Sequence, residues 1–398
     1  MESFVLLTKD VFATRYLPTY GDNFWKTPNI DALAEKGTVF YRHYTAAPST
    51  AMSFTSMFTT KYPYQLDRRT YVHVDDMKDT VTFFNKLEKQ GFSNHIIWSK
   101  NYLKAALPFS NCFGSAKTVF HNLDINRSVG PHVGGKKISI VRDDEVARNS
   151  MNSIYTEIDS ALNTDKPVFL WIHLPHVILG RTGYGDDIDL VDELVGYLRE
   201  KFGDNNIFIS ADHGNMDGKK NKCVYGFDVY EPAVRIPLIT PRLENTARVD
   251  RPTSNKDIET VLLERRIPSC DFVCSDTAYF AQPHRKFAVI GERYKYIYNK
   301  KTKTEELYDI IYDPNEEVNL AVTKLYDVDR KVTYEKAEVY FYPYWDEAAA
   351  KLNEYREFKN SIWRTGTFYE EKLSGIIKTI TKPRYFIKAI IKNKKNKL

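Results

Sequence analysis

Four side chains able to bind a divalent metal and attack an ester lie far apart in the sequence. Asp10 follows the apolar run FVLLTK, Thr50 follows the segment AAPS, and the pair Asp212-His213 follows NIFISA. Carboxylate oxygens with one imidazole suit manganese, zinc, magnesium or calcium. Such a cation stabilises the alkoxide of a hydroxyl and neutralises the oxygens of a phosphate or sulfate. The pattern is typical of metal-assisted attack on a tetrahedral ester, with Thr50 as the nucleophile.

Each of these residues also has a plain structural interpretation. Thr50 stands in a Ser- and Thr-rich turn, where its hydroxyl would cap a helix that begins there. The free N–H groups of the same helix start would equally favour a phosphate. Asp212 would cap a turn, His213 would pack in the core and Asp10 would be a turn residue. The residues taken alone leave both interpretations open.

Apolar runs that predict strands alternate with amphipathic segments that predict helices. Helices are expected over residues 27–37, 49–60, 79–90, 144–162 and 187–202. Strands are expected at FVLLTK, at VFYRHYTA and over residues 95–99, 168–174 and 206–211. This alternation predicts an α/β fold with a mostly parallel central sheet and helices on both faces.

Several polar residues fall just after the expected strands. In parallel sheets, functional side chains collect at the carboxyl ends of the strands. The residues at such positions are Asp10, Lys100, His173, His176, Asp212 and His213. Their shared placement is stronger evidence for a site than any one of them alone.

The pattern of expected elements changes after about residue 275, from alternating strands and helices to consecutive strands. The segment RKFAVIGERYKYIYNKKTKTEELYDI predicts two or three antiparallel strands joined by a polar turn. Residues beyond it are expected to be helical and become increasingly basic. We predict a catalytic α/β domain over residues 1–275, a smaller antiparallel subdomain over 276–344 and a basic helical tail over 345–398.

The net positive charge of the chain comes from its C-terminal end. The formal net charge is +5, but nine Lys or Arg and no Asp or Glu follow Glu371, which leaves about −4 for the rest. A nucleic-acid-binding face on the main domain is therefore not expected. The segment 378–398 interleaves Ile, Phe and Tyr with Lys and Arg. This pattern suits either an amphipathic helix on an anionic membrane surface or a solvated C-terminus.

Neither the cysteines nor the start of the chain indicates an extracellular or membrane-spanning protein. No second Cys or His pair completes the spacing of Cys270 and Cys274 into a zinc site. The opening MESFVLLTKD has no basic start followed by a long apolar stretch, so no signal peptide and no transmembrane helix are expected. The expected location is cytoplasmic, and peripheral at the inner membrane face if the basic tail docks there.

Four ordered segments resemble the sulfatase-like branch of the alkaline phosphatase superfamily. SADHGNMDG (210–218) resembles its Asp-His-Gly metal motif, and TPNIDALAEKGTVFYRHYTAAPS resembles the stretch that leads to the nucleophile. YEPAVRIPLI (230–239) resembles the Tyr-Glu…Arg-x-Pro-Leu element, and residues 294–321 resemble the C-terminal hairpin. The resemblance implies an alkaline-phosphatase-like fold and a metal site made of Asp10, Thr50, Asp212 and His213.

The nucleophile position separates the branches of this superfamily. Sulfatases carry Cys or Ser followed by Pro and Arg, and the Cys or Ser is converted to formylglycine. Here the run is TAMSFTSMFT, with Thr50 as the nucleophile and with Met52 and Phe54 in place of Pro and Arg. The extra methyl group of threonine blocks conversion to the aldehyde. The run resembles instead that of the phosphoethanolamine transferases, and the lipoteichoic acid synthase branch likewise uses a threonine.

The same resemblance assigns roles to three more residues. IIWSKNYL (96–103) resembles the Gly-Lys-Trp-His-Leu element, which places Lys100 near the substrate oxygens. His173 and His176 in WIHLPH resemble the His…Pro-His of the family, so one of them would hold the phosphate or protonate the leaving oxygen. Each also fits a packed core histidine. The aspartate pair of sulfatases is Asp10-Val11 here, which implies one tightly held metal and leaves room for a weaker second one.

Two activities follow from the resemblance. The first is a phosphoryl-group transferase that forms phospho-Thr50 and modifies a cell-surface glycan or its lipid-linked precursor. The transferred group would be of the phosphoethanolamine or glycerol-phosphate type. The second is a hydrolase of phosphodiester, phosphonate or sulfate esters with the same nucleophile and metal. A non-enzymatic binding module is disfavoured because all four residues of the metal site are intact.

Overall fold

The structure of the chain is a computed structural model. It describes residues 2–22, 24–65, 80–99, 113–121, 126–133, 136–142, 144–175, 187–216, 218–222, 225–277, 285–321, 325–326, 331–333 and 339–362. Two of the residues predicted to act at the site, Lys100 and His176, lie outside the described residues, and so does the basic segment 378–398.

Eight strands form the central sheet, in the order β12-β2-β11-β9-β1-β8-β4-β5. The strands from β9 to β5 are parallel to one another, whereas β11 pairs antiparallel with both of its neighbours. Their bounds are Phe4–Lys9 (β1), Thr38–Phe40 (β2), Ser93–Ser99 (β4), Lys117–His121 (β5), Val168–Leu174 (β8), Ile207–Ala211 (β9), Leu238–Thr240 (β11) and Arg248–Val249 (β12). The predicted mostly parallel sheet is confirmed.

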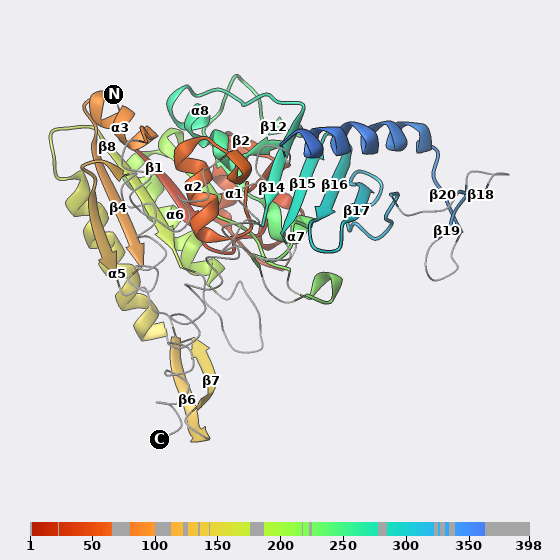
Figure 1. Ribbon diagram of the computed structural model, residues 1–398. Coiled ribbons are helices and arrows are strands. Elements are labelled where there is room, and N and C mark those ends of the chain that lie inside the picture. The colour runs from red at the N-terminus through yellow and green to blue at the C-terminus, as the bar shows by residue number, and fades with distance from the viewer. Residues whose placement is uncertain are drawn as a thin grey trace, which may run out of the picture.

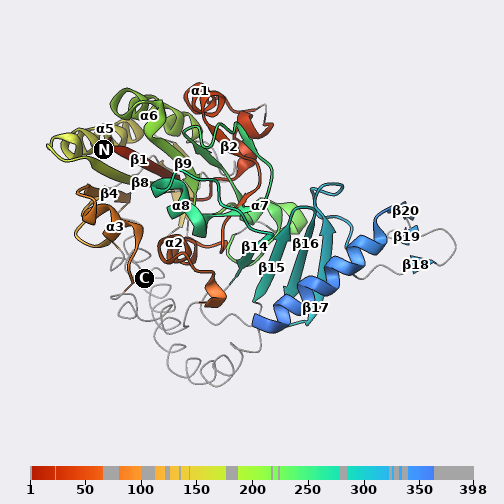
Figure 2. The ribbon, with the colours of Figure 1, turned by 90° about the horizontal axis from the view of Figure 1, so that it is seen from above.

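Helices cover both faces of this sheet (Figures 1 and 2). Alternate residues of β1 divide between the faces, as strand geometry requires. Val5 and Leu7 belong to one core with apolar residues of α1, α5 and α6. Phe4 and Leu6 belong to the other, with residues of α2, α3 and α8. Because both faces of β1 are covered, its run of apolar residues is unbroken.

The predicted helices are confirmed to within a few residues. The α-helices are Pro28–Lys36 (α1), Thr50–Thr59 (α2), Phe83–Lys89 (α3), Asp144–Leu162 (α5), Ile188–Phe202 (α6), Glu231–Val234 (α7) and Ile258–Leu263 (α8). Short 3-10 helices are Thr14–Tyr16 (η1), Pro18–Tyr20 (η2), Pro63–Gln65 (η3), Asp204–Asn206 (η8), Lys219–Asn221 (η9) and Asn255–Asp257 (η10). The helix expected from residue 79 begins only at Phe83, because Thr82 and Asn85 form a reciprocal capping box there.

The single strand expected at VFYRHYTA is wrong. The chain turns at Tyr41 and Arg42, so this segment forms β2 and a separate strand, His43–Tyr44 (β3). Strand β3 leaves the central sheet and lies between Arg235–Ile236 (β10) and Thr253–Ser254 (β13) in a small sheet of three strands. The apolar pattern continues through both pieces and does not show the change of partner.

A four-stranded antiparallel sheet follows the α/β part. Its strands, in order, are Phe272–Asp276 (β14), Lys286–Gly291 (β15), Tyr294–Asn299 (β16) and Thr304–Asp309 (β17). One face packs against the helix formed by residues 345–362, and the other packs against α7 and its neighbours (Figure 2). The segment predicted to form two or three antiparallel strands forms β15, β16 and β17. The fourth strand, β14, begins at Phe272, before the boundary predicted after residue 275, so the antiparallel sheet begins earlier than expected.

The remaining strands form two small sheets. Asn126–Val133 (β6) and Lys136–Arg142 (β7) pair as an antiparallel hairpin. Leu325–Tyr326 (β18), Lys331–Thr333 (β19) and Val339–Phe341 (β20) make a three-stranded antiparallel sheet. Among the described residues, none of the helices has the length and apolar character that crossing a bilayer requires.

His43 makes the stability of the fold depend on pH. Its side chain is buried in β3, with Nδ1 2.9 Å from Thr253 Oγ1, and burial lowers its pKa to about 3. In the unfolded chain His43 binds a proton near pH 6.5, whereas in the folded chain it stays neutral at that pH. The free energy of unfolding therefore decreases as the pH falls below about 6.5.

We expect acidification from pH 7 to pH 5 to cost about 2 kcal/mol through His43 alone. Urea unfolding at both pH values measures this loss. In His43→Gln the difference between the two pH values should shrink by about that amount. An unchanged difference would show that His43 does not titrate in this way.

Candidate metal and nucleophile site

The site forms where two adjacent parallel strands end. In the register of β1 and β9, Lys9 lies opposite Ala211, so the next residues, Asp10 and Asp212, leave the sheet side by side. The backbone N–H of Asp10 donates to the carbonyl oxygen of Leu174 at the end of β8. The carboxyl ends of three neighbouring strands thus meet at one point, as predicted from the sequence.

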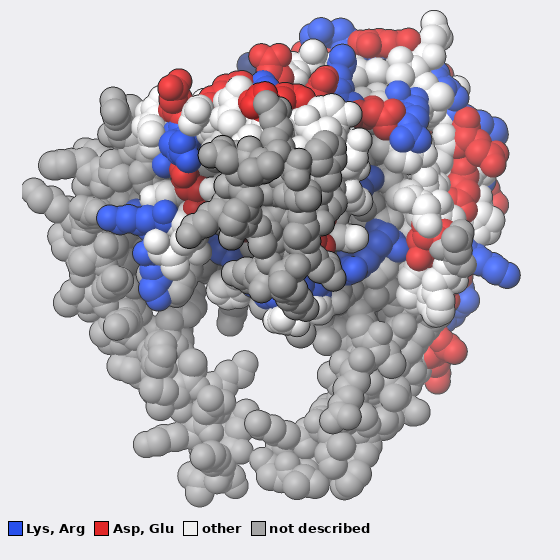
Figure 3. All heavy atoms as spheres, turned by 90° about the vertical axis from the view of Figure 1, so that its right-hand side faces the viewer, with Lys and Arg blue, Asp and Glu red and all other residues white. Residues whose placement is uncertain are grey.

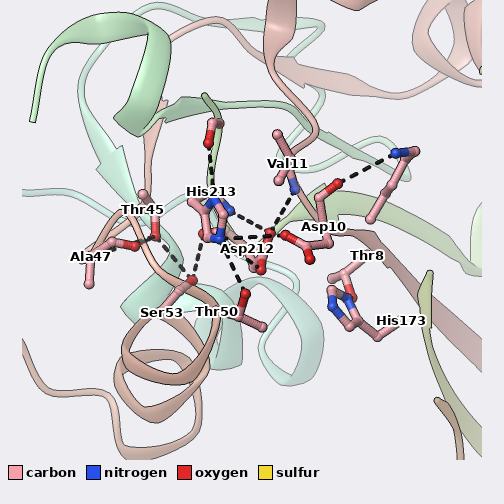
Figure 4. A network of polar contacts seen from close by, with 12 residues as sticks. Thr8, Asp10, Val11, Thr45, Ala47, Thr50, Ser53, His173, Asp212 and His213 are labelled. Carbon is pink, nitrogen blue, oxygen red and sulfur yellow. Dashed lines mark hydrogen bonds and ion pairs between the residues drawn. The ribbon is translucent and has the colours of Figure 1, made fainter. Parts of the chain in front are cut away.

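Asp10, Asp212 and His213 form a buried group that can hold a metal ion. One ligand atom from each residue lies within 4.8 Å of the others, and all three side chains are completely buried. His213 Nε2 is 3.5 Å from Asp10 Oδ1 and 3.3 Å from Asp212 Oδ2 (Figure 4). Two carboxylates and an imidazole are a donor set for manganese, zinc or a similar divalent ion.

The backbone fixes the orientation of Asp212. Its Oδ1 accepts from the N–H of Val11 at 3.2 Å and from the N–H of His213 at 2.7 Å. Val11 has a φ of 59°, a left-handed conformation that a β-branched residue adopts only under strain. This strained turn directs the N–H of Val11 at the carboxylate of Asp212. By the resemblance to sulfatases, Val11 occupies the position of their second aspartate.

The tautomer of His213 is set by its other nitrogen. Nδ1 lies 2.9 Å from the carbonyl oxygen of Gly214 and must donate to it, so Nε2 carries a lone pair directed at the carboxylates. Burial lowers the pKa of His213, and the charge of Asp10 only partly opposes this. A neutral imidazole held by a backbone carbonyl is the usual state of a metal-binding histidine.

Burial and the charge of Asp10 raise the pKa of Asp212 well above its ordinary value. Two ionised carboxylates cannot share a dry site without a cation between them. A divalent ion would displace the proton and join the two carboxylates, so the residues present fit such an ion.

Thr50 is placed next to this group by α2. It is the first helical residue, after the N-cap Ser49, so the alternative that Thr50 is itself the N-cap is not what the structure has. Thr50 Oγ1 lies 3.2 Å from His213 Nε2, and the side chain is 9% exposed. The hydroxyl of Thr50 therefore lies within reach of two acceptors, the lone pair of His213 Nε2 and the carboxylate of Asp212, whose pKa a hydrogen bond from Thr50 lowers. The four residues predicted for the metal site therefore meet in one place.

His173 lies beside Asp10 but deep in the core (Figure 4). It is completely buried, with Nδ1 3.0 Å from Thr8 Oγ1 and its ring against Phe54 and Trp98. Burial lowers its pKa to about 3, although the charge of Asp10 acts in the opposite direction. A histidine that stays neutral in this way is a poor proton donor near pH 7, so the packing interpretation fits it better.

The sequence did not predict the polar network that connects α2, which carries Thr50, to the loop of residues 212–215, which we call the metal loop. Ser53 of α2 donates to the carbonyl oxygen of Asp212 at 2.6 Å. Asn255, completely buried in η10, donates to Ser53 Oγ at 2.8 Å and accepts from the N–H of Ala46 at 2.8 Å. Asn255 precedes a helix in TSNKD and looks like an ordinary capping residue, so only its burial in the fold reveals the link.

Comparison with known proteins relates the first part of the chain to one family. The sulfatase family model matches residues 3–177, the part that contains Asp10, Thr50 and His173. No curated protein sequence matches the chain significantly.

Solved structures share the fold over nearly the whole chain. A 2-O GAG sulfatase, BT1596, aligns with a TM-score of 0.66 and 15% identity, covering 93% of this chain and 94% of its own. The phosphonate monoester hydrolase of Agrobacterium radiobacter aligns with a TM-score of 0.61 and 16% identity, covering 92% and 96%. The family match, the fold and the buried Asp/Asp/His group together support a sulfatase-like enzyme that acts on esters.

Replacing Asp212 with asparagine tests the metal group. An amide can still accept from the N–H groups of Val11 and His213, but it carries no charge. We expect the metal-free variant to be at least as stable as the parent. In the parent, Mn²⁺ at a hundred times its Kd should add about 2.7 kcal/mol of stability, and in Asp212→Asn this gain should disappear.

Thermal unfolding with and without Mn²⁺ measures both effects. Asp250→Asn is the matched control, since the carboxylate of Asp250 is 59% exposed and pairs with Arg248 at the surface. Equal stabilisation of Asp212→Asn and the parent by Mn²⁺ would remove Asp212 from the metal site.

Proposed function

We propose that this protein is a metal-dependent phosphoryl-group transferase in which Thr50 attacks a phosphate ester and carries the group as phospho-Thr50. The observation that supports this most directly is the 3.2 Å contact between Thr50 Oγ1 and His213 Nε2, inside a group of buried metal-binding side chains. The acceptor would be a hydroxyl of a surface glycan or of its lipid-linked precursor, and the transferred group would be of the phosphoethanolamine or glycerol-phosphate type.

The chain supplies the nucleophile and a cradle for the anion. In the first step a bond forms between Thr50 Oγ and phosphorus while the bond from phosphorus to the donor's leaving oxygen breaks. The hydroxyl of Thr50 loses its proton as the new bond forms, and a proton is returned through solvent to the oxygen of the departing alcohol, because the Nε2 lone pair of His213 would be held by the metal ion. The free N–H groups in the first turn of α2 face the phosphate oxygens. A bound divalent ion would lower the pKa of the hydroxyl and neutralise charge on those oxygens.

The second step reverses the first with a different alcohol. The acceptor hydroxyl attacks phosphorus, the bond to Thr50 Oγ breaks, and the threonine hydroxyl is restored. If water takes the place of the alcohol, the same residues perform hydrolysis. This hydrolase of phosphodiester, phosphonate or sulfate esters is the second candidate function, and a phosphonate monoester hydrolase is among the solved structures that share the fold.

The surroundings of Thr50 support a phosphate ester over a sulfate ester. Phe54, at the position where sulfatases carry an arginine, is completely buried against Trp171 and His173. An apolar core residue there cannot bind an anion, and threonine cannot become formylglycine. The chemistry of this position therefore differs from that of sulfatases even though the fold is shared.

Substitutions at Thr50 distinguish the contribution of its hydroxyl to catalysis from that of its size and shape. With Mn²⁺, Thr50→Ala should lose turnover of a chromogenic phosphodiester by at least about 10³-fold, because the nucleophile is gone. Thr50→Ser keeps the hydroxyl and should retain activity within about tenfold. Thr55→Ala is the matched control on the same helix, where Thr55 Oγ1 only donates to the carbonyl oxygen of Ala51.

Intact-mass spectrometry after incubation with Mn²⁺ and a phosphatidylethanolamine or phosphatidylglycerol donor identifies the activity. An adduct on Thr50 that persists without acceptor supports the transferase. Rapid turnover without an adduct supports the hydrolase. Turnover of an aryl sulfate but of no phosphodiester contradicts both phosphate reactions.

The basic segment 378–398 would bring the enzyme to a lipid-linked substrate. Each Lys or Arg near an anionic surface contributes on the order of 1 kcal/mol to binding. Figure 3 shows Lys and Arg interspersed with Asp and Glu on the described part of one face. Such a mixture does not form the continuous basic track that a nucleic acid needs.

A version of the chain that ends at Glu371 tests this membrane contact. The full chain should sediment with vesicles containing anionic lipid, and should be released as salt is raised. The shortened chain should remain in the supernatant under the same conditions. Equal sedimentation of the two proteins would exclude a role for the tail in membrane binding.

A further inference from the structure

The short helix α7 supports both halves of the site through its backbone. Gly214 and Asn215 of the metal loop donate to the carbonyl oxygens of Ala233 and Pro232, each at 2.9 Å. A side chain at Gly214 would collide with the carbonyl oxygen of Pro232, so the loop and α7 are in direct contact.

The nucleophile side of the site is attached to the same helix. Thr45, in the loop that leads to Thr50, donates its N–H to the carbonyl oxygen of Val234 at 2.8 Å. A helix of four residues has too few hydrogen bonds of its own to fix its position. Other parts of the protein must therefore hold α7.

A buried group of three charged residues holds the start of α7. Lys295, in β16 of the antiparallel sheet, has its Nζ 3.0 Å from Oε1 of Glu231, the first residue of α7. The same Nζ is 2.8 Å from Glu316 Oε1, and Glu316 Oε2 accepts the N–H of Glu231 at 2.8 Å. Tyr44 adds a hydrogen bond from its hydroxyl to Glu231 Oε2 at 3.2 Å.

This charged group is unusual for its position. Lys295 and Glu316 have completely buried side chains, and Glu231 is 12% exposed. Lys295 lies on the face of β16 that carries Ile297, which packs against α7 and its neighbours, where an apolar residue would be expected. Buried ion pairs often add little to stability, because desolvation offsets their attraction. Their benefit is a fixed geometry.

We propose that Lys295 is a positioning residue for the metal site: by fixing Glu231 it holds α7, and α7 holds the loop that carries Asp212 and His213. The antiparallel sheet thus completes the site although none of its residues belongs to the metal group. The proposal rests on the metal group of the proposed function and is independent of which phosphate ester reacts.

Lys295→Met removes the charge but keeps the length of the side chain. We expect the amide hydrogens of Gly214 and Asn215 in the metal-free protein to exchange about tenfold faster, because their acceptors on α7 are less well held. We also expect the Kd for Mn²⁺, measured by calorimetry, to rise about tenfold, as is typical when the support of a metal ligand is lost.

Two further variants separate positioning from general loss of stability. Arg293→Met, two residues away, breaks a pair with the buried Asp309 at 2.8 Å but does not involve α7, so it should lower the melting temperature without changing either readout. Lys295→Met combined with Glu316→Gln removes one unpaired carboxylate while the amide still accepts from Glu231. This double variant should regain stability and keep the faster exchange and the weaker Mn²⁺ binding.

The proposal is overturned if folded Lys295→Met, or the double variant, exchanges Gly214 and Asn215 and binds Mn²⁺ like the parent. It is also overturned if Arg293→Met changes both readouts equally. Failure of the proposed function would be seen separately, as the absence of any adduct on Thr50 in a parent protein that still binds Mn²⁺.

Discussion

Two buried carboxylates that face each other determine the chemistry of this site. Asp10 and Asp212 are sealed from water, and His213 beside them is kept neutral by burial. In such surroundings one carboxylate must hold a proton or both must share a cation. The strained turn at Val11 and the tautomer of His213 favour the second arrangement, because they direct lone pairs toward one point. Thr50, the start of α2 and the polar network are all arranged around that point.

Much of this could be predicted from strand ends alone. Asp10 and Asp212 follow strands that pair in parallel, so a correct expectation of a parallel sheet already brings them together. The helix 144–162 and the strand 168–174 were predicted with their observed bounds, because their apolar periods are long and regular. The sequence did not predict that β2 and β3 pair in different sheets, because both strands continue the same apolar pattern. The roles of Asn255 and Lys295 were not predicted, because their partners are distant in the sequence.

The comparisons establish the fold of this protein but not its substrate. Identities of 15% and 16% with solved structures are enough to establish the shared fold, but they do not transfer a substrate. The residues around Thr50 carry the distinction. Phe54 lies in an aromatic core with Trp98 and Trp171, so the position of an anion-binding arginine has become part of the hydrophobic packing. In the proposed reaction with a phosphate ester, the metal group and the N–H groups of α2 would then have to neutralise the phosphate.

The antiparallel sheet is best regarded as part of the site. If the sheet only packed against the α/β part, the face toward α7 would carry apolar side chains throughout, as it does at Ala288, Ile290 and Ile297. Instead it presents Lys295, whose completely buried ammonium group lies between Glu231 and Glu316. Burial raises the pKa of Glu316 to about 7, although Lys295 opposes this, so the group is costly to assemble. Such a cost is retained where it fixes a geometry, and the geometry fixed here is that of α7, on which the metal loop and the nucleophile loop both depend.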